Sequence, residues 1–526
     1  MKTSTKIIAM LLLATSFAQA QNACFLPQVT YATGAAPVGN CVGDFNGDNK
    51  LDIASANQTG TVSIFLGVGN GTFGAATNFV AGTQPYGIAT GDINSDTKLD
   101  LVVANIGNYS ITVLLGNGAG SFGAPTNYTI TGNANPREVA LGDFDNDSKL
   151  DIAVIAPISN NVGIFINNGT GLFGGMANYS IGSTGPSDLV VADLNADGKL
   201  DVATSNSTGN NCSVLIGDGF GSFAAGVPYA TGTSSYGIVA TDLNGDGKFD
   251  LCVTNNGSAN MSVLINNGNG TFAPQVPIAL GVGSTARNIK AGDFNNDGKK
   301  DVAISDPGLT KAHVLLGNGA GGFPVLNSFT TGGAPNYLSL GDFNADGKLD
   351  MVVCNQANAN NGVLINSAPT VTFATLADVC VNTPPFTLTG GSPVSGTYSG
   401  VGVNAGIFDP SVSGVGTFTI NYSYNDVNGC NGNAQQTINV GCTGIQNMTD
   451  KFSIGFYPNP SDGKFKLASD HPLSSGVIIV RNVSGQIIFR SENLTQEFDL
   501  SHEAAGIYFA EVHTKDGAIF SKLVLR

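Results

Sequence analysis

The chain has 526 residues, enough for three or more domains, and a formal net charge of −16 at pH 7. Charged residues make up only 11% of it, and Gly occurs 71 times. Glu, a good helix former, is rare, so the composition argues against a helical protein. The acidic balance also argues against nucleic acid as a partner, because no basic stripe exists to meet phosphates. We expect a nearly all-β protein.

Residues 1–20 have the pattern of a secretory signal peptide. Lys2 and Lys6 form a basic start, an apolar stretch follows, and Ala18-Gln19-Ala20 is typical of a cleavage site. The apolar stretch is too short to span a bilayer, which disfavours a membrane anchor. We predict that the mature protein begins at Gln21, that it is exported, and that it has no transmembrane segment after cleavage.

Export makes disulfides possible, and the chain has eight Cys residues. We expect at least one disulfide in a later segment that holds three of them, Cys380, Cys430 and Cys442. Three others lie in predicted strands, where we expect them to act as small buried apolar residues: Cys212, Cys252 and Cys354.

A nine-residue unit recurs seven times in residues 21–367. Its copies begin at Asp44, Asp92, Asp143, Asp193, Asp242, Asp293 and Asp342, so successive copies start 48 to 51 residues apart. In the second repeat, apolar strands are predicted at 86–92, 99–105, 111–117 and 126–132, with the nine-residue unit between the first two. Four antiparallel strands in each period of about fifty residues predict a seven-bladed β-propeller.

The two ends of the repeat array complement each other. The seventh repeat ends near residue 367 without a fourth strand, whereas residues 28–34 look like a fourth strand without the first three. We therefore predict that this N-terminal strand completes the last blade, which removes an exposed sheet edge. The alternative, an open solenoid, would need capping repeats at both ends.

Each nine-residue unit carries carboxylate or amide oxygens at positions 1, 3, 5 and 9, and position 7 would add a backbone carbonyl. Oxygen ligands in a flexible loop favour calcium, whereas magnesium keeps several waters and zinc prefers nitrogen and sulfur. The unit is not an EF-hand, because Val253 stands where that loop needs a Glu. We predict up to seven Ca²⁺ ions. The candidate ligands are Asp44, Asn46, Asp48, Asp52, Asp92, Asn94, Asp96, Asp100, Asp143, Asp145, Asp147, Asp151, Asp193, Asn195, Asp197, Asp201, Asp242, Asn244, Asp246, Asp250, Asp293, Asn295, Asp297, Asp301, Asp342, Asn344, Asp346 and Asp350.

A simpler interpretation is that these Asp and Asn residues only form Asx-turns. Turn chemistry explains one or two such residues, but not four at fixed offsets. It also leaves like charges together, which at about 5 Å repel by roughly 3 kcal/mol at an effective dielectric constant of about 20. Position 6, where we expect positive φ, is Gly in the last four copies but Asn49, Thr97 and Ser148 in the first three. Thr tolerates positive φ poorly, so the second loop fits the pattern least well.

The unit "GDFNGDGKxDLxVxN", followed by "VxLLGNGxGxF", resembles the FG-GAP/VCBS repeats of integrin α-subunit propellers and of many secreted bacterial proteins. The resemblance covers residues 25–366. It implies that the aspartate loops bind calcium between the first two strands of each blade. It does not imply a particular ligand for the propeller.

Two further segments follow the propeller. Residues 368–443 are β-rich, Gly-rich and almost free of Lys and Arg, and resemble the immunoglobulin-like β-sandwich modules of bacterial surface proteins, in which case they act as a spacer. Residues 446–526, with "FYPNPSDGKFKL" and a terminal "KLVLR", resemble the type A C-terminal sorting domain of the Bacteroidota type IX secretion system. This resemblance implies a small C-terminal β-sandwich, the type IX secretion machinery as a partner, and a protein that is secreted or attached to the outer cell surface.

Few residues in the propeller could perform catalysis. His313 is the only His before residue 471, and we expect it to be a surface side chain. Glu138 is the only Glu in the repeats, and carboxylates that bind calcium are poor general acids. We therefore predict that the chain is not an enzyme.

The chain lacks Trp, but it has aromatic and basic residues that could line one propeller face: Tyr86, Tyr236, Arg137 and Arg287. We interpret the two Tyr residues as packing residues. The sequence favours a secreted or surface calcium-binding propeller that acts as an adhesion or interaction module for an unknown extracellular protein or glycan. The alternatives are a carbohydrate-binding lectin and a non-catalytic part of a secreted hydrolase system.

Overall fold

The computed structural model describes residues 23–130, 135–426, 430–441, 454–469, 475–494, 497–514 and 517–526. The expected signal peptide and Cys442 lie outside these residues. Among the described residues there are only two short helices, η1 (Gln356–Asn358) and α1 (Pro410–Ser413), and all other regular elements are strands. The prediction of an all-β protein is therefore confirmed.

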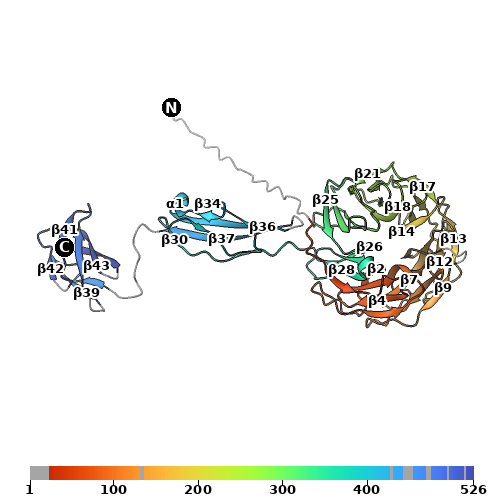
Figure 1. Ribbon diagram of the computed structural model, residues 1–526, viewed down its shortest axis with the longest axis horizontal. Coiled ribbons are helices and arrows are strands. Elements are labelled where there is room, and N and C mark those ends of the chain that lie inside the picture. Colours follow the sequence, from red (N-terminus) through yellow and green to blue (C-terminus); the bar gives the residue numbers. More distant parts are fainter. Residues whose placement is uncertain are drawn as a thin grey trace, which may run out of the picture. The chain divides into compact units, whose positions relative to one another are not determined.

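Seven four-stranded antiparallel sheets are arranged around a ring, as Figure 1 shows. The first strands, which line the axis, are β2 (Pro37–Gly43), β6 (Pro85–Gly91), β10 (Val139–Gly142), β14 (Pro186–Ala192), β18 (Ser235–Thr241), β22 (Ile289–Gly292) and β26 (Pro335–Gly341). The second strands are β3 (Asp52–Asn57), β7 (Asp100–Asn105), β11 (Asp151–Ala156), β15 (Asp201–Asn206), β19 (Asp250–Asn255), β23 (Asp301–Asp306) and β27 (Asp350–Asn355).

The third strands are β4 (Thr61–Phe65), β8 (Ser110–Leu114), β12 (Asn161–Phe165), β16 (Asn211–Leu215), β20 (Asn260–Leu264), β24 (Lys311–Leu316) and β28 (Asn360–Leu364). The fourth strands are β5 (Thr77–Val80), β9 (Thr126–Thr129), β13 (Ala177–Ser180), β17 (Val227–Ala230), β21 (Val276–Ala279), β25 (Val325–Thr330) and β1 (Val29–Ala32). This is a seven-bladed β-propeller.

The fourth strand of the last blade comes from the N-terminal part of the chain. β1 pairs antiparallel with β28, with Val29 opposite Val363 and Ala32 opposite Asn360. The pairing begins earlier, because the Leu26 N–H donates to the Ile365 carbonyl at 2.9 Å. The ring is thus closed by strand pairing between the two ends of the repeat array, and this sheet has the same four strands as the other six.

The hydrophobic core lies between the blades. The second strand of each blade is buried at every position, as expected for near-continuous apolar runs covered on both faces. One core cluster, for example, packs Val102 and Val113 of the second blade against Ile152 and Val154 of the third. Each blade therefore depends on its neighbours for burial, as in other repeat architectures.

The middle part of the chain forms three small sheets. They consist of β29 (Thr372–Phe373) with β32 (Gly391–Ser392); of β30 (Val379–Cys380), β37 (Asn431–Gly441), β36 (Gly416–Asn425) and β33 (Thr397–Ser399); and of β31 (Phe386–Thr387), β35 (Ile407–Phe408) and β34 (Val403–Asn404). Cys380 is disulfide-bonded, whereas Cys430 is a free thiol.

The C-terminal part forms two sheets with one shared hydrophobic core, which includes Phe465, Phe498 and Leu523. The sheets are β38 (Ile454–Tyr457), β39 (Lys464–Ser469) and β42 (Glu497–Asp499); and β41 (Ile487–Ser491), β40 (Gly476–Arg481), β43 (Gly506–Thr514) and β44 (Gly517–Leu525).

The chain divides into two compact units. The first contains the propeller through Val371 together with Pro393–Gly396 and Ser423–Asn433. The hairpin end between β36 and β37, predicted from the sequence to be part of the spacer, therefore belongs to the same compact unit as the propeller. None of the described helices is long and apolar enough to cross a membrane.

Candidate functional site

Each nine-residue aspartate loop joins the first strand of a blade to the second. Its ninth residue is also the first residue of the second strand, and this Asp is completely buried in all seven blades: Asp52, Asp100, Asp151, Asp201, Asp250, Asp301 and Asp350. The residues at positions 1, 3 and 5 lie nearer the surface. The loop thus has a buried end and an exposed end.

The buried carboxylate accepts a backbone N–H bond at each oxygen. In the fifth blade, Oδ2 of Asp250 accepts the Leu243 N–H at 3.0 Å, and Oδ1 accepts the Asn266 N–H at 2.8 Å. The same pair of bonds recurs in every blade. Position 9 therefore ties the loop to the end of the third strand, a role that the residue type alone did not reveal.

The exposed oxygens of the loop accept local backbone N–H bonds. In the fifth blade, the two oxygens of Asp242 accept from Asp246 at 3.2 Å and Gly247 at 2.8 Å. Oδ1 of Asn244 accepts from Asp246, and Oδ1 of Asp246 accepts from Lys248. These are the bonds of Asx-turns, so turn chemistry is present. A carboxylate has about four acceptor sites, so each loop keeps lone pairs for a cation.

Positive φ occurs at two positions of every loop. Position 6 has φ between 61° and 83° throughout, including Thr97 at 69°, as the sequence analysis expected for a tight loop. Position 4 is also left-handed, with φ between 55° and 77°, which was not foreseen. Gly47, Gly245, Asn146 and Asn296 occupy it in four copies and are the available signal, because Gly and Asn favour this region.

A lysine ammonium lies beside the position-5 carboxylate in six loops. The distances run from 2.6 Å for Lys149–Asp147 to 3.7 Å for Lys199–Asp197 and Lys248–Asp246. These pairs are exposed, and exposed pairs contribute little to stability. Their geometry indicates that this corner of the loop attracts positive charge.

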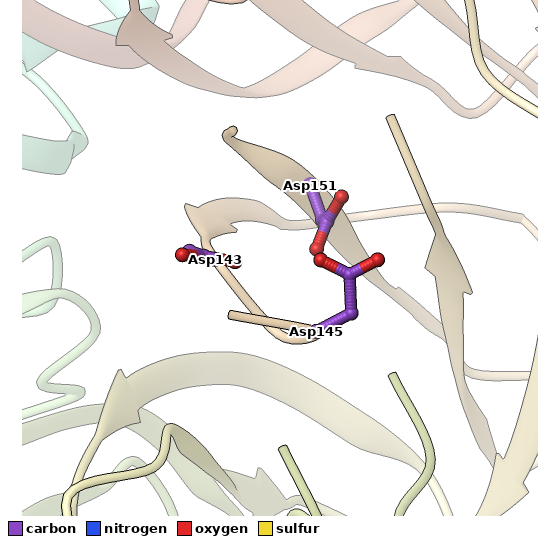
Figure 2. Close-up of side chains that lie close together, drawn as sticks. All are labelled: Asp143, Asp145 and Asp151. Carbon is purple, nitrogen blue, oxygen red and sulfur yellow. The ribbon is translucent and has the colours of Figure 1, made fainter. Parts of the chain in front are cut away.

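The third loop has the densest negative charge, because Asp145 replaces the Asn found at position 3 of the other six. Oxygen atoms of Asp143, Asp145 and Asp151 lie within 4.8 Å of one another. Figure 2 shows the carboxylates of Asp145 and Asp151 turned toward each other. Burial raises the pKa of Asp151 to about 6; two backbone N–H bonds oppose this shift, and the charges of Asp145 and Asp147 add to it. A cation would relieve this repulsion.

A second cluster lies on the propeller axis and contains the residues singled out in the sequence. The Arg137 guanidinium donates from Nη2 to Tyr86 Oη at 3.2 Å and to Tyr236 Oη at 3.0 Å, and the two hydroxyls are 2.8 Å apart. Arg137 also lies 5.1 Å and 5.4 Å from the centroids of these two rings. Arg287 lies 5.4 Å from the Tyr236 ring and donates to Asn336. We call these residues the axial cluster. The two Tyr rings are packing residues here, as interpreted from the sequence.

A cavity of about 600 Å³ adjoins the axial cluster and is lined by the first strands, with Glu138, Asp188 and Lys290 among its walls. Tyr337 donates its hydroxyl to Glu138 Oε2 at 2.5 Å. Burial, reinforced by the charge of Asp188, raises the pKa of Glu138 to about 8. Burial also raises the pKa of Asp188 to about 6, against the opposing charge of Lys290.

The expectation that His313 is a surface side chain was wrong, because it is buried with 2% exposure. Its Nε2 lies 3.1 Å from Asp306 Oδ2 and its Nδ1 lies 2.8 Å from Ser328 Oγ. This resembles a Ser-His-Asp arrangement. However, the same three strand positions hold a polar ladder in other blades, such as Asn57, Ser63 and Asn78 in the first and Asn105, Thr112 and Asn127 in the second. His313 therefore occupies a structural position that repeats around the ring.

Two family models match the chain. The FG-GAP-like repeat matches residues 44–103, 92–154, 150–204, 193–253 and 242–304, and the secretion system C-terminal sorting domain matches residues 455–526. The chain is an FG-GAP repeat protein with a type IX secretion sorting domain. It is therefore a secreted or cell-surface protein, as predicted.

No curated protein matches this FG-GAP repeat protein. Three solved structures resemble it at low identity. They are a catalytically inactive virginiamycin B lyase from Staphylococcus aureus with quinupristin (16% identity, TM-score 0.43, 65% of this chain and 98% of that one), BBS1N in complex with ARL6DN (11%, 0.46, 66% and 98%), and a functionally unknown protein from Desulfotomaculum acetoxidans (14%, 0.41, 58% and 92%).

Proposed function

We propose that this FG-GAP repeat protein is a calcium-stabilised, non-catalytic propeller that acts outside the cell as an adhesion or interaction module. The observation that carries the proposal is the aspartate loop, which places four oxygen-bearing side chains at the same offsets in seven successive blades. The sorting domain supports an extracellular site of action. The middle segment would act as a spacer between the propeller and the sorting domain.

Calcium suits the donor set better than other biological cations. The loop offers only oxygen atoms, from carboxylates at positions 1, 5 and 9, an amide or carboxylate at position 3, and a backbone carbonyl at position 7. Such oxygen-rich, flexible sites select calcium. A bound ion would supply the positive charge that neutralises the carboxylates and would link the first two strands of the blade.

A non-catalytic role is supported by how the titratable groups of the propeller are used. The buried His313 belongs to a polar ladder whose counterparts occur in the first and second blades, and Glu138 is hydrogen-bonded to Tyr337. Seven blades that each contribute similar exposed loops offer a broad surface instead, which suits non-covalent binding of an extracellular partner.

The calcium part of the proposal is tested with purified secreted protein. We expect elemental analysis to find several calcium ions per chain, and chelation to lower the melting temperature by about 10 °C or more, because several sites would each lose stabilisation. Asp246→Ala should remove one ion, since it deletes a candidate calcium ligand whose Oδ1 accepts the Lys248 N–H at the exposed end of the loop. The matched control is Asp218→Ala, which removes an exposed Asp outside the loops. No bound metal and an unchanged melting temperature would overturn the proposal.

The binding part needs a separate measurement. A glycan array and an extracellular-matrix protein array are probed with and without chelator. Binding to proteins supports the interaction module, and calcium-dependent binding to sugars supports the lectin. Turnover on a panel of polysaccharide and peptide substrates would contradict the non-catalytic role.

A further inference from the structure

Two thiols that are 406 positions apart in the sequence meet in the propeller's compact unit. Cys24 precedes β1, and Cys430 lies at the end of the hairpin formed by β36 and β37. The side chain of Cys430 is hydrogen-bonded to the side chain of Cys24 and to the backbone of Phe25. Both cysteines are free thiols in the structure.

The backbone on each side of this contact is held in place. The Cys24 N–H donates to Asn366 Oδ1 at 3.2 Å, and Phe25 forms a β-bridge with Asn366. On the other side, the Cys430 N–H donates to Asp426 Oδ1 at 2.9 Å, and the Asp426 N–H donates to the Cys430 carbonyl at 2.9 Å. The two thiols therefore face each other from segments that are anchored independently.

The other free thiols among the described residues have a different environment. All four are buried inside the blades, where burial raises the pKa of each thiol: Cys41, Cys212, Cys252 and Cys354. Cys24, in contrast, is partly exposed. Cys24 is therefore the thiol of the pair that an oxidant would reach first, because Cys430 is buried.

We propose that Cys24 and Cys430 form a disulfide in the exported protein. The oxidant is a protein disulfide of the thiol oxidoreductase class, which acts in the bacterial periplasm. The Cys24 thiolate attacks one sulfur of that disulfide, which gives a mixed disulfide and releases the other sulfur as a thiolate. Cys430 then loses its proton and attacks Cys24 Sγ, so that the Cys24–Cys430 bond forms and the oxidoreductase leaves as a dithiol. Two thiol protons and two electrons are lost by the chain and gained by the oxidant and solvent.

This bond would help to keep the ring of blades closed. β1 begins five positions after Cys24 and is the strand that completes the last blade. With the disulfide in place, β1 could not leave β28 without carrying the hairpin end with it. A crosslink that closes so long a loop also restricts the unfolded chain strongly.

Peptide mapping tests the proposal directly. The secreted protein is alkylated under native, non-reducing conditions and digested with chymotrypsin, because no Lys or Arg separates Cys24 from Cys41 or Cys430 from Cys442. Cleavage after Phe25 frees Cys24 from Cys41, and fragment spectra distinguish Cys430 from Cys442. We expect a linked peptide that contains Cys24 and Cys430 and lacks two hydrogens. Alkylation of both residues, or a link from either to another Cys, would overturn the proposal.

Melting temperatures provide a second test. We expect Cys24→Ser to lower the melting temperature by about 5 °C or more under non-reducing conditions. Under reducing conditions, the wild type and the variant should melt at similar temperatures, because reduction of the Cys380 disulfide affects both equally. A difference that persists unchanged after reduction would mean that Cys24 contributes only packing. Cys430→Ser and the double variant should have the same melting temperature as Cys24→Ser. If Cys430→Ser does not fold, the melting temperatures of wild type and Cys24→Ser with and without reductant still test the proposal.

Discussion

The aspartate loops and the axial cluster lie at two ends of the same first strands, yet they follow opposite rules. The loops repeat the same residue types at the same offsets in all seven blades. Six positions before each loop, the seven copies instead hold five different residue types: Val38, Tyr86, Arg137, Ser187, Tyr236, Arg287 and Asn336. The residues that repeat are therefore those that every blade requires, and the residues that vary are those that meet at the axis of the ring.

The physical reason is the symmetry of the ring. A loop is stabilised within its own blade and by the next blade, so each copy faces the same requirements. On the axis, all seven blades converge on one space, where the Arg137 guanidinium is hydrogen-bonded to both Tyr86 and Tyr236 and Arg287 lies against the other side chains of the cluster. Seven arginines there would repel one another, so the axial residues must differ.

Among single substitutions, the greatest loss of stability is expected at position 9 of the aspartate loops. Asp301→Ala in calcium-free protein leaves the Phe294 and Gly317 N–H groups buried without acceptors, which should lower the free energy of unfolding by about 3–5 kcal/mol. Asp297→Ala in the same loop removes an exposed carboxylate and should have a small effect without calcium. Chemical denaturation measures both variants.

Addition of calcium then separates the role of Asp301 as a hydrogen-bond acceptor from its role as a calcium ligand. Both variants should lose one bound ion, so their difference in stability should persist when calcium is added. If Asp301→Ala were no more destabilising than Asp297→Ala without calcium, the double hydrogen bond would not be the reason for burying position 9.

At Glu138, beside the axial cluster, loss of the hydrogen-bond acceptor should reduce the stability more than loss of the ionisable carboxyl group. The pKa of Glu138 is raised to about 8 by burial and by the charge of Asp188, so its carboxyl is mostly neutral at pH 7. Glu138→Gln keeps an acceptor for Tyr337 and should change stability by less than about 1 kcal/mol. Glu138→Ala leaves the Tyr337 hydroxyl without its acceptor and should cost about 2–3 kcal/mol. Equal losses for the two variants would contradict a neutral carboxyl.

The sequence predicted the features that repeat. The seven blades followed from the recurrence of the nine-residue unit, and positive φ at position 6 followed from Gly198, Gly247, Gly298 and Gly347. Position 4 was missed because Ala and Ser occupy it in three copies, where the fold overrides their preference. The double role of position 9 was missed because a ligand and a hydrogen-bond acceptor require the same residue type.

Features that depend on long-range contacts could not be derived. Tyr86, Arg137 and Tyr236 come from three different blades, and only ring closure brings them together. His313 was misplaced because its burial depends on polar contacts with Asp306 and Ser328 on the two adjacent strands of the same blade. Cys24 and Cys430 belong to different predicted domains, so no spacing rule relates them.

The pH dependence of the calcium-free protein should be dominated by the buried end of the loops. Burial raises the pKa of Asp151, Asp201, Asp301 and Asp350 to about 6. A folded state that binds more protons than the unfolded state loses stability as pH rises, here between about pH 4 and pH 6. The exposed position-5 carboxylates of Asp48, Asp96, Asp147 and Asp297 have a lowered pKa, so their contribution is lost only below about pH 4.

Thermal melts of chelated protein from pH 4.5 to pH 7.5 measure this effect. We expect the melting temperature to fall across the range, and the gain from added calcium to grow as the carboxylates ionise. Asp301→Asn should flatten the fall in proportion to one site of seven. A melting temperature that rises with pH in chelator would show that these buried groups do not control the stability.

The smallest expected effect concerns the loop with the least suitable residue. Thr97 has φ of 69°, a region that β-branched residues disfavour, whereas Gly247 has φ of 81° at the same position of the fifth loop. Thr97→Gly should stabilise the calcium-free protein by about 0.5–1 kcal/mol, because relief of backbone strain exceeds the entropy that Gly loses on folding. Gly247→Thr should destabilise by a similar amount, and a Cβ there would meet no atom within 4 Å, so backbone strain alone is measured. Since the fold imposes left-handed backbone at this position in both loops, opposite signs for the two substitutions are required; the same sign for both would mean that the position-6 side chain makes contacts that outweigh its backbone conformation.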